Sequence, residues 1–303
     1  LLGFVFVLIV LERWSRRRAR FHHTSNKYSE IRRYQLQGAL KYLAFAACLL
    51  PVLLGFLLPA LQLLTWTVTT AEETISLSFF TLTWHSLMLA AIAALVAVVL
   101  ALLLAYGKRL RSTPLIEGSV RAAAMGYAVP GTVIAVGVLI PFAWLDNTID
   151  GWMRDTFGIS TGLLLSGTLV ALIFAYTVRF LSVSIQAVES GLAKIKPSMD
   201  DAGRSLGLRP MGVLRRIHLP IMKGTVLTAL LLVFVDVLKE LPATLILRPF
   251  NFNTLAVRAY EMAADERLAD AGAPALMIVL AGIIPVILLS RAISRARAGG
   301  EIQ

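Results

Sequence analysis

The sequence has little of what soluble enzymes depend on. Only 16% of its 303 residues are charged, whereas soluble domains carry about one quarter. It contains neither the Gly-x-x-x-x-Gly-Lys-Ser/Thr loop of ATPases nor the His-Glu-x-x-His motif of zinc hydrolases. Its single cysteine, Cys48, excludes a disulfide within the chain and leaves the redox compartment open. We therefore assign no catalytic residue and expect no cofactor on this chain.

Long apolar runs are what the sequence does contain. Hydrophobic residues make up 57% of the chain, and they gather in runs of about 20 residues, the length that a helix needs to cross a bilayer. The pattern predicts an all-α, polytopic transmembrane bundle with six spans and a further partial span at the N-terminus. The six spans are expected at about 38–64, 85–106, 122–144, 162–181, 221–241 and 273–290.

The basic residues predict the orientation of these spans. Lys and Arg number 21 in segments 12–37, 107–121, 182–219 and 291–303, against 4 in the alternate segments 65–84, 145–161 and 241–272. Because basic loops stay in the cytoplasm, both ends of the 38–303 region and the loop before the fifth span are expected there. The net charge of +11 then reflects membrane topology, and nucleic-acid binding is not expected.

The first 37 residues predict two short segments before the main domain. Residues 1–11 are apolar and are followed at once by Glu12–Arg13. This order is the reverse of a secretory signal, so 1–11 is expected to be the end of a preceding transmembrane helix. Residues 12–37 are expected to form a basic cytoplasmic linker. The pair His22–His23 in this linker has no other ligand residues nearby, so no metal site is expected.

The stretch 198–220 is the longest polar interruption in the second half of the chain. Ser198 is expected to cap a short helix through a capping box with Asp201, and Gly207 is expected to end that helix and reverse the chain. Pro210 is expected to start a second short helix. Leu219–Pro220 should close the second helix and begin the fifth span.

This stretch resembles the cytoplasmic loop of permease subunits of bacterial ABC importers. The family pattern is Glu-Ala-Ala, three residues, Gly, nine residues, Ile, one residue and Leu-Pro. The sequence has Asp201-Ala202-Gly203, Gly207, Ile217 and Leu219-Pro220 at the same spacings. It departs from the pattern at Asp201, which keeps the charge of Glu, and at Gly203, which lowers helix propensity by up to about 1 kcal/mol.

The resemblance implies a type I importer permease domain at 38–303 with a coupling loop at 198–220. It implies ATPase subunits that hold ATP and magnesium, a periplasmic binding protein, a second permease half and a location in the bacterial inner membrane. The residues that it implies for coupling to the ATPase are Asp201, Ala202, Gly203, Gly207, Leu208, Arg209, Met211, Gly212, Arg215, Arg216, Ile217, Leu219 and Pro220.

A charged patch near the end of the fifth span is the candidate translocation-path site. Asp236, Lys239 and Glu240 are spaced to share one helix face just before Pro242. Charges within spans are costly and usually face a cavity or each other, so either a path lining or an internal pair satisfies the pattern. Arg179 is expected near the inner end of the fourth span, with its charged group reaching the membrane surface.

The cargo is suggested by the resemblance alone. The segment Lys239–Ala256 is similar to the iron(III) branch of the family, whose members are often two fused permease halves, and residues 1–11 would then end a first half. Ferric iron is therefore the expected cargo, with thiamine, a polyamine or another small solute as alternatives. A membrane signalling protein or a channel with a partner-docking loop is the alternative from another class.

Overall fold

The computed structural model describes residues 34–298, and every regular element in that part of the chain is helical. The predicted helix end at 1–11, the pair His22–His23 and most of the predicted linker lie outside the described residues. The chain divides into two compact units with a boundary between Thr65 and Trp66. The described part of the first unit contains α2 (Ala39–Val52), the π-helical η1 (Leu53–Leu57) and the beginning of α3 (Leu58–Thr69).

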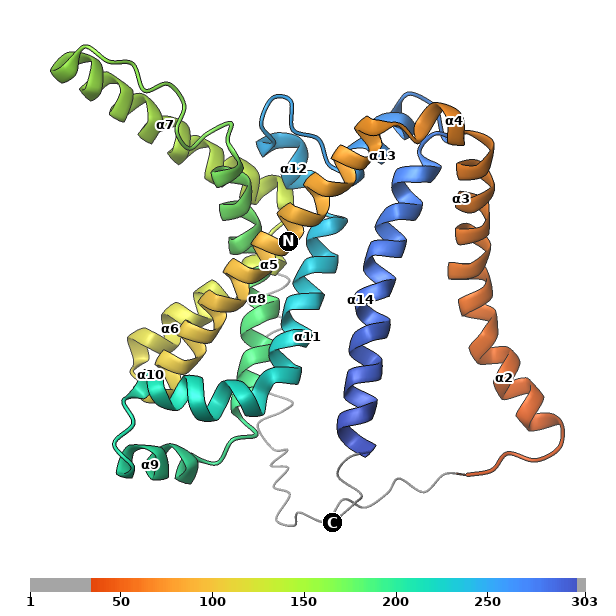
Figure 1. Ribbon diagram of the computed structural model, residues 1–303, viewed down its shortest axis with the longest axis horizontal. Helices are drawn as coiled ribbons and strands as arrows, with labels where there is room; N and C mark the ends of the chain where they lie inside the picture. The colour runs from red at the N-terminus through yellow and green to blue at the C-terminus, as the bar shows by residue number, and fades with distance from the viewer. Residues whose placement is uncertain (1–33, 299–303) are drawn as a thin grey trace. The chain divides into compact units, whose positions relative to one another are not determined.

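The second unit contains the remaining elements (Figure 1). They are α4 (Ala71–Thr74), α5 (Leu77–Leu110), α6 (Pro114–Ala123), η2 (Gly126–Ala128), α7 (Gly131–Phe157), α8 (Leu169–Leu192), α9 (Pro197–Ser205), α10 (Pro210–Val213), η3 (Leu214–His218), α11 (Leu219–Leu238), α12 (Pro242–Leu247), α13 (Leu255–Ala264) and α14 (Gly272–Ala298).

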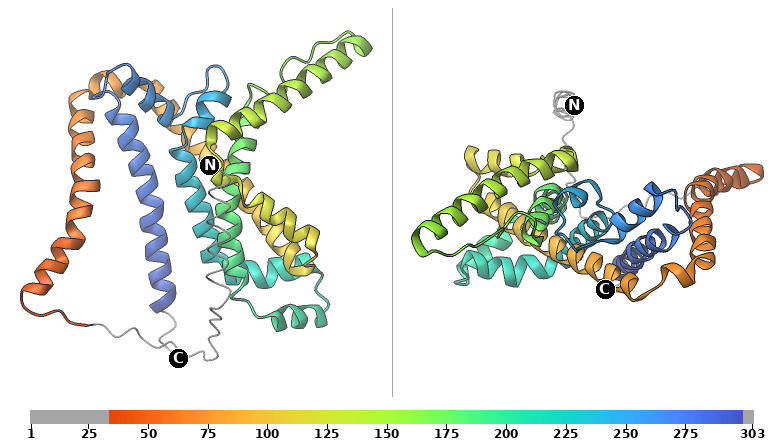
Figure 2. Two further views of the ribbon diagram at one scale, coloured as in Figure 1. Left: turned by 180° about the vertical axis from the view of Figure 1, so that it is seen from behind. Right: turned by 90° about the horizontal axis from the view of Figure 1, so that it is seen from above.

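Three long helices, α5, α8 and α11, form the core of this unit. Each packs against the other two, as the views in Figure 2 also show. The buried face of α5 is a stripe of alanines that includes Ala90, Ala93, Ala97 and Ala101. Small side chains let helix backbones approach closely. In a bilayer, where association of helices releases no water, the van der Waals contacts of such close packing are a main source of stability.

The predicted fold class is confirmed, although the number of spans differs slightly. Among residues 34–298, five helices are long and apolar enough to cross a membrane: Ala39–Thr69, Leu77–Leu110, Gly131–Phe157, Leu169–Leu192 and Pro210–Leu238. The sixth predicted span lies within α14, which runs from Gly272 to Ala298 and includes the apolar stretch Gly272–Ile287.

The third predicted span, at 122–144, is placed wrongly, and so is the loop predicted after it. The chain forms α6, breaks at η2 and continues as α7 as far as Phe157. Two carboxylates on α7 hold the segment that follows. Asp146 accepts hydrogen bonds from the amides of residues 164–166, the shortest 2.7 Å, and Asp150 accepts them from the amides of Thr161 and Gly162.

The break between α6 and α7 is pressed tightly against α8. A Cβ on Gly126 would lie 1.9 Å from the carbonyl oxygen of Val178, which belongs to the α8 backbone. The clash would be with backbone atoms, so no side-chain rotation could relieve it. Glycine at this position is therefore needed for η2 to lie on α8.

We predict that Gly126→Ala destabilises the protein by about 2–3 kcal/mol or more, because overpacking against a fixed backbone cannot relax. The matched control is Gly137→Ala on the exposed side of α7, where an added Cβ meets nothing within 4 Å. The control should be neutral or slightly stabilising, by up to about 1 kcal/mol. The thermal unfolding midpoint of both variants in detergent provides the measurement. Equal midpoints for the two variants would contradict the prediction.

Candidate functional site

The helix α9 ends at a glycine corner, as the sequence predicts. Gly207 has a φ of +82°, a backbone conformation that favours glycine. The amide of Leu208 donates to the carbonyl of Gly203 at 3.0 Å, and the amide of Gly207 donates to the carbonyl of Arg204 at 2.9 Å. These two bonds form a Schellman motif, which satisfies the last carbonyls of the helix.

The beginning of α9 differs from the prediction. The helix starts at Pro197 with Lys196 as its N-cap, and no side chain caps it. Ser198 is therefore already inside the first turn and cannot act as the N-cap of a capping box. Pro197 has no amide proton to satisfy and its fixed φ suits the first helical position, which moves the N-cap two residues earlier, from Ser198 to Lys196.

The second short helix does not close before the fifth span. α10 runs through the π-helical η3 directly into α11, so that Pro210–Leu238 is one helix of 29 residues. Pro220, in the first turn of α11, lacks an amide proton and disrupts regular hydrogen bonding there, and the π-helical turn lies just before it. The chain changes direction between α10 and α11 (Figure 1). Any displacement of α10 is transmitted to α11 without an intervening loop.

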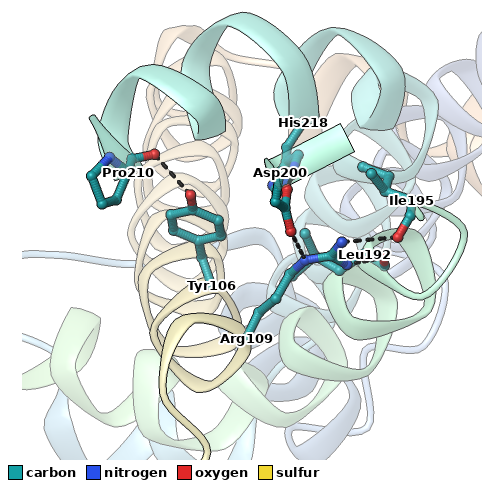
Figure 3. A network of polar contacts seen from close by, with 7 residues as sticks. All are labelled: Tyr106, Arg109, Leu192, Ile195, Asp200, Pro210 and His218. Carbon is teal, nitrogen blue, oxygen red and sulfur yellow. Dashed lines mark hydrogen bonds and ion pairs between the residues drawn. The ribbon is translucent and has the colours of Figure 1, made fainter. Parts of the chain in front are cut away.

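One carboxylate, Asp200, ties the corner to the core helices (Figure 3). Its Oδ2 accepts from Nε of Arg109 at 2.8 Å, and its Oδ1 is hydrogen-bonded to Nε2 of the fully buried His218. Burial raises the pKa of Asp200, but the hydrogen bonds from Arg109 and His218 outweigh this, so the pKa is held below its ordinary value. Asp200 is therefore ionised at neutral pH. Its carboxylate joins α9 to α5 through Arg109 and to η3 through His218.

Arg109 and Tyr106, both near the end of α5, make further contacts to the same region. Nη1 and Nη2 of Arg109 donate to the carbonyl oxygens of Leu192 and Ile195 at 2.6 and 2.9 Å. The hydroxyl of Tyr106 donates to the carbonyl of Pro210 at 2.8 Å. Figure 3 shows that these side chains reach from α5 to the end of α8, to α9 and to α10. The corner is thus linked to α5 as well as to α11.

The sequence analysis selected Asp201 and missed Asp200. Asp201 is exposed, whereas Asp200 is only 9% exposed and holds both internal partners. The one available signal was the acidic pair in the first turn of a short helix. Its partners Arg109 and His218 are 91 and 18 residues away in the chain, a distance over which periodicity gives no information.

Gly203 has a packing role at the corner. A Cβ on Gly203 would lie 2.8 Å from Cδ1 of Ile217 and 3.2 Å from Cγ2 of Val213. Gly203 is buried, so its lack of a side chain lets α9 rest directly on α10 and η3. Glycine in place of the family's alanine at position 203 therefore lets α9 approach α10 and η3 more closely, although glycine lowers helix propensity.

The other predicted coupling residues are mostly on the surface of the corner. Met211 is 45% exposed, and Leu206, which lies beside these residues but outside the predicted set, is 83% exposed. The exposed members also include Asp201, Ala202, Gly207, Arg209, Arg215, Arg216 and Pro220, whereas Leu208, Gly212, Ile217 and Leu219 are half-buried. The corner thus presents apolar side chains among basic ones, a surface suited to a protein partner with an acidic rim.

The candidate path residues do not share one face, contrary to the prediction. α11 ends at Leu238, so the helical spacing fails before Glu240. Lys239 pairs with Asp236 at 2.9 Å and its side chain is 63% exposed. Glu240 turns inward, is 5% exposed and accepts from the amides of Ala243 and Thr244 at 3.2 Å. Pro242 lies in the first turn of α12, which explains why the helix breaks here.

Arg179 is also not where the sequence analysis placed it. α8 extends from Leu169 to Leu192, so Arg179 lies about 15 Å from one end and about 20 Å from the other at 1.5 Å per residue. It therefore lies near the middle of α8 and not near the end of that helix. An arginine within an apolar run was the signal for such a position. Among the described residues, no three His, Cys, Asp or Glu side chains form a metal-binding group.

The chain is similar in sequence to ABC-transporter permeases. No family model matches it. It is 32% identical over 165 residues to the Fe(3+)-transport system permease protein FbpB 2 of Haemophilus influenzae, covering 54% of this chain and 29% of that protein. It is 25% identical over 168 residues to a putative 2-aminoethylphosphonate transport system permease protein, PhnV, of Salmonella typhimurium, covering 55% and 57%. These matches span less than two thirds of each relative.

Solved structures show the same fold at lower identity. A chain of a bacterial alginate ABC transporter, solved with an alginate-bound periplasmic protein, superposes with a TM-score of 0.63 at 13% identity, covering 85% of this chain and 95% of that chain. A chain of the methionine ABC transporter MetNI, in an inward-facing conformation, gives 0.52 at 16% identity, covering 73% and 98%. The chain therefore has the same fold as these ABC-transporter chains.

We predict that Asp200→Ala destabilises the protein by about 3 kcal/mol, because it leaves Arg109 and the buried His218 without their shared partner. Asp201→Ala is the matched control, since it removes an exposed carboxylate one residue away and should change stability by about 0.5 kcal/mol or less. Thermal unfolding in detergent at neutral pH gives both values. A larger loss for the Asp201 variant would reverse our assignment of the structural carboxylate.

Proposed function

We propose that this chain, a relative of ABC-transporter permeases in sequence and in fold, is the membrane-spanning subunit of an ATP-driven importer. The observation that carries the proposal is the corner at 198–220. The family spacing from Asp201 to Pro220 runs from α9 across the Gly207 corner, and its part from Pro210 onward is continuous with α11. A loop that only joined two spans would need neither that spacing nor the buried Asp200 anchor.

In this proposal the partner ATPase docks on the corner. The segment from Leu208 to Arg216 enters a cleft of the ATPase, with Met211 as an apolar contact and Arg209, Arg215 and Arg216 around it. ATP and magnesium are held by that partner, which supplies the energy. When the ATPase subunits close, they move α10, and the movement reaches α11 directly and α5 through Tyr106 and Arg109.

The same proposal places the protein in the bacterial inner membrane with the corner in the cytoplasm. The distribution of Lys and Arg between alternate loops supports this orientation. A periplasmic binding protein then delivers cargo on the opposite side. A second permease half, fused or separate, completes the path, because one half presents α-helices on one side of a path only.

Ferric iron is the cargo that we propose. The resemblance of Lys239–Ala256 to the iron(III) branch supports it, as does the similarity to a permease named for Fe(3+) transport. Other relatives are named for 2-aminoethylphosphonate transport, so a small anionic solute is the main alternative cargo. Thiamine and polyamines are further alternatives. The alternative from another class, a channel or signalling protein, would require no ATP for its activity.

We predict that a cysteine at position 211 crosslinks to the cognate ATPase. Cys48 is the only native cysteine, so Cys48→Ser provides a clean background for Met211→Cys. The intact complex should give a crosslinked band with a short bifunctional thiol reagent and an ATPase carrying a cysteine in its docking cleft. Phe157→Cys is the matched control, since Phe157 is exposed and ends α7, whose end lies far from α9 and α10 (Figure 1).

Free reactivity of the cysteine at 211 towards a bulky maleimide in the intact complex would falsify the docking proposal. In the same background, Gly207→Val should abolish ATP-dependent uptake, because a β-branched residue is strained at a positive φ. Activity that continues without ATP would instead favour a channel.

We predict ATP-dependent uptake of radiolabelled ferric iron when the chain is reconstituted with its ATPase and binding protein. Unlabelled iron should compete, whereas thiamine and putrescine should not. Uptake of a labelled phosphonate without iron uptake would replace the cargo while leaving the importer assignment intact. Absence of uptake of every solute, together with no crosslink from position 211, would count against the importer itself.

A further inference from the structure

Two helix breaks meet in the middle of the second unit. One lies between α6 and α7 and includes η2, and the other lies at residues 239–241 between α11 and α12. α7, α8 and α12 contact one another, and η2 contacts α8. Broken helices at this depth are costly unless their ends serve a purpose, because each exposes backbone polar groups to hydrocarbon. The N-terminus of α7, at Gly131, is one of the ends that meet here.

A cation and an anion face the same point at that end. A Cβ on Gly131 would lie 2.6 Å from Nη1 of Arg179 and 2.7 Å from Oε1 of Glu240. Arg179 and Glu240 are thus close neighbours over the first residue of α7, yet they form no ion pair with each other. The absence of a side chain at Gly131 leaves both charged groups room to move at this point.

Arg179 has far fewer partners than a guanidinium in a membrane helix requires. Nη1 donates to the carbonyl of Val129 at a long 3.4 Å, and the guanidinium lies 5.8 Å from the ring of Phe180. Its Nε is buried and has no hydrogen-bond partner. A guanidinium carries five N–H donors, and an unpaired charge at this depth is expensive, so a strong acceptor is missing.

Glu240 does not supply that acceptor, because its carboxylate is used elsewhere. It accepts from the amides of Ala243 and Thr244 and from the hydroxyl of Thr244. These neutral donors fix the carboxylate at the start of α12 and leave its negative charge in place. The hydroxyl of Thr244 also lies 2.5 Å from that of Tyr176. These contacts hold the Glu240 carboxylate near Arg179 without an ion pair between the two side chains.

We infer that Arg179, at the N-terminus of α7, binds an anionic group of the cargo during translocation, and that Glu240 is the fixed negative charge that limits how tightly it is held. The inference rests on the proposed importer function and names its substrate class: an oxyanion or an anion-complexed cargo. The positive end of a helix and a guanidinium both favour an anion. Glu240 nearby keeps binding weak enough for release, which transport requires.

The test is chemical labelling of Arg179 in the wild-type complex, so it does not depend on a variant that folds. The complex of the chain with its ATPase, in nanodiscs, is treated with phenylglyoxal with and without ATP, and labelling is read by peptide mass spectrometry. Inorganic phosphate is the anionic probe and choline chloride the cationic one. We expect phosphate at about ten times its Kd to slow labelling of Arg179 by about tenfold, because the unoccupied fraction falls as 1/(1 + [L]/Kd), and choline to have no effect.

Arg121 provides the matched control in the same sample. It is an exposed arginine on α6, paired with Glu117, and phosphate should not protect it. In Glu240→Gln, protection of Arg179 should need several-fold less phosphate, because the neighbouring negative charge is gone. A purely structural Glu240 would leave the phosphate requirement unchanged.

Two results would overturn the inference. Labelling of Arg179 that phosphate does not slow would show that no anion binds there. Absence of labelling in every nucleotide state would show that the path does not reach Arg179, whose partner is then a carboxylate of the other permease half. Either result leaves the importer proposal standing if position 211 still crosslinks to the ATPase, so the two failures are distinguishable.

Discussion

The ion pair between Asp200 and Arg109 is the contact on which the polar end of the second unit depends. Asp200 also binds the buried His218, and Arg109 also binds two carbonyls at the end of α8. Four helical segments therefore share one pair of charges. Because the pair is largely buried, removing one partner would leave the other without its counter-charge, so the pair fixes α9 against α5 and η3.

Glycines and prolines determine where the helices of the corner and of α11 turn, break or pack closely. Gly207 reverses the chain, and Gly203 lets α9 rest on α10 and η3. Pro220 and Pro242 mark the bend into α11 and the break after it. At the far end of α11, that break brings Glu240 beside Arg179. The corner at 198–220 and the proposed anion site thus lie at opposite ends of one continuous helix.

Local patterns predicted the features that depend on near neighbours. The all-helical class, the Gly207 corner and the start of α10 at Pro210 follow from hydrophobic run length and from backbone preferences of single residues. The same reasoning failed at Ser198, at the third span and at Glu240. In each case a neighbouring proline or a tertiary contact decided the helix boundary. Pro197 starts α9 before Ser198, and Pro242 starts α12 just after Glu240. Asp146 and Asp150 on α7 bind the segment that follows that helix.

The sequence by itself determined that the chain is a helical membrane protein, because the length of an apolar run is a local property of the chain. It also showed that the stretch 198–220 resembles importer permeases, because motif spacing is local too. Only the tertiary structure decided that Asp200 rather than Asp201 anchors the corner and that Arg179 lies at mid-helix beside Glu240. Those facts depend on residues up to 91 positions apart, and a buried charge takes its partner from whichever helix packs against it.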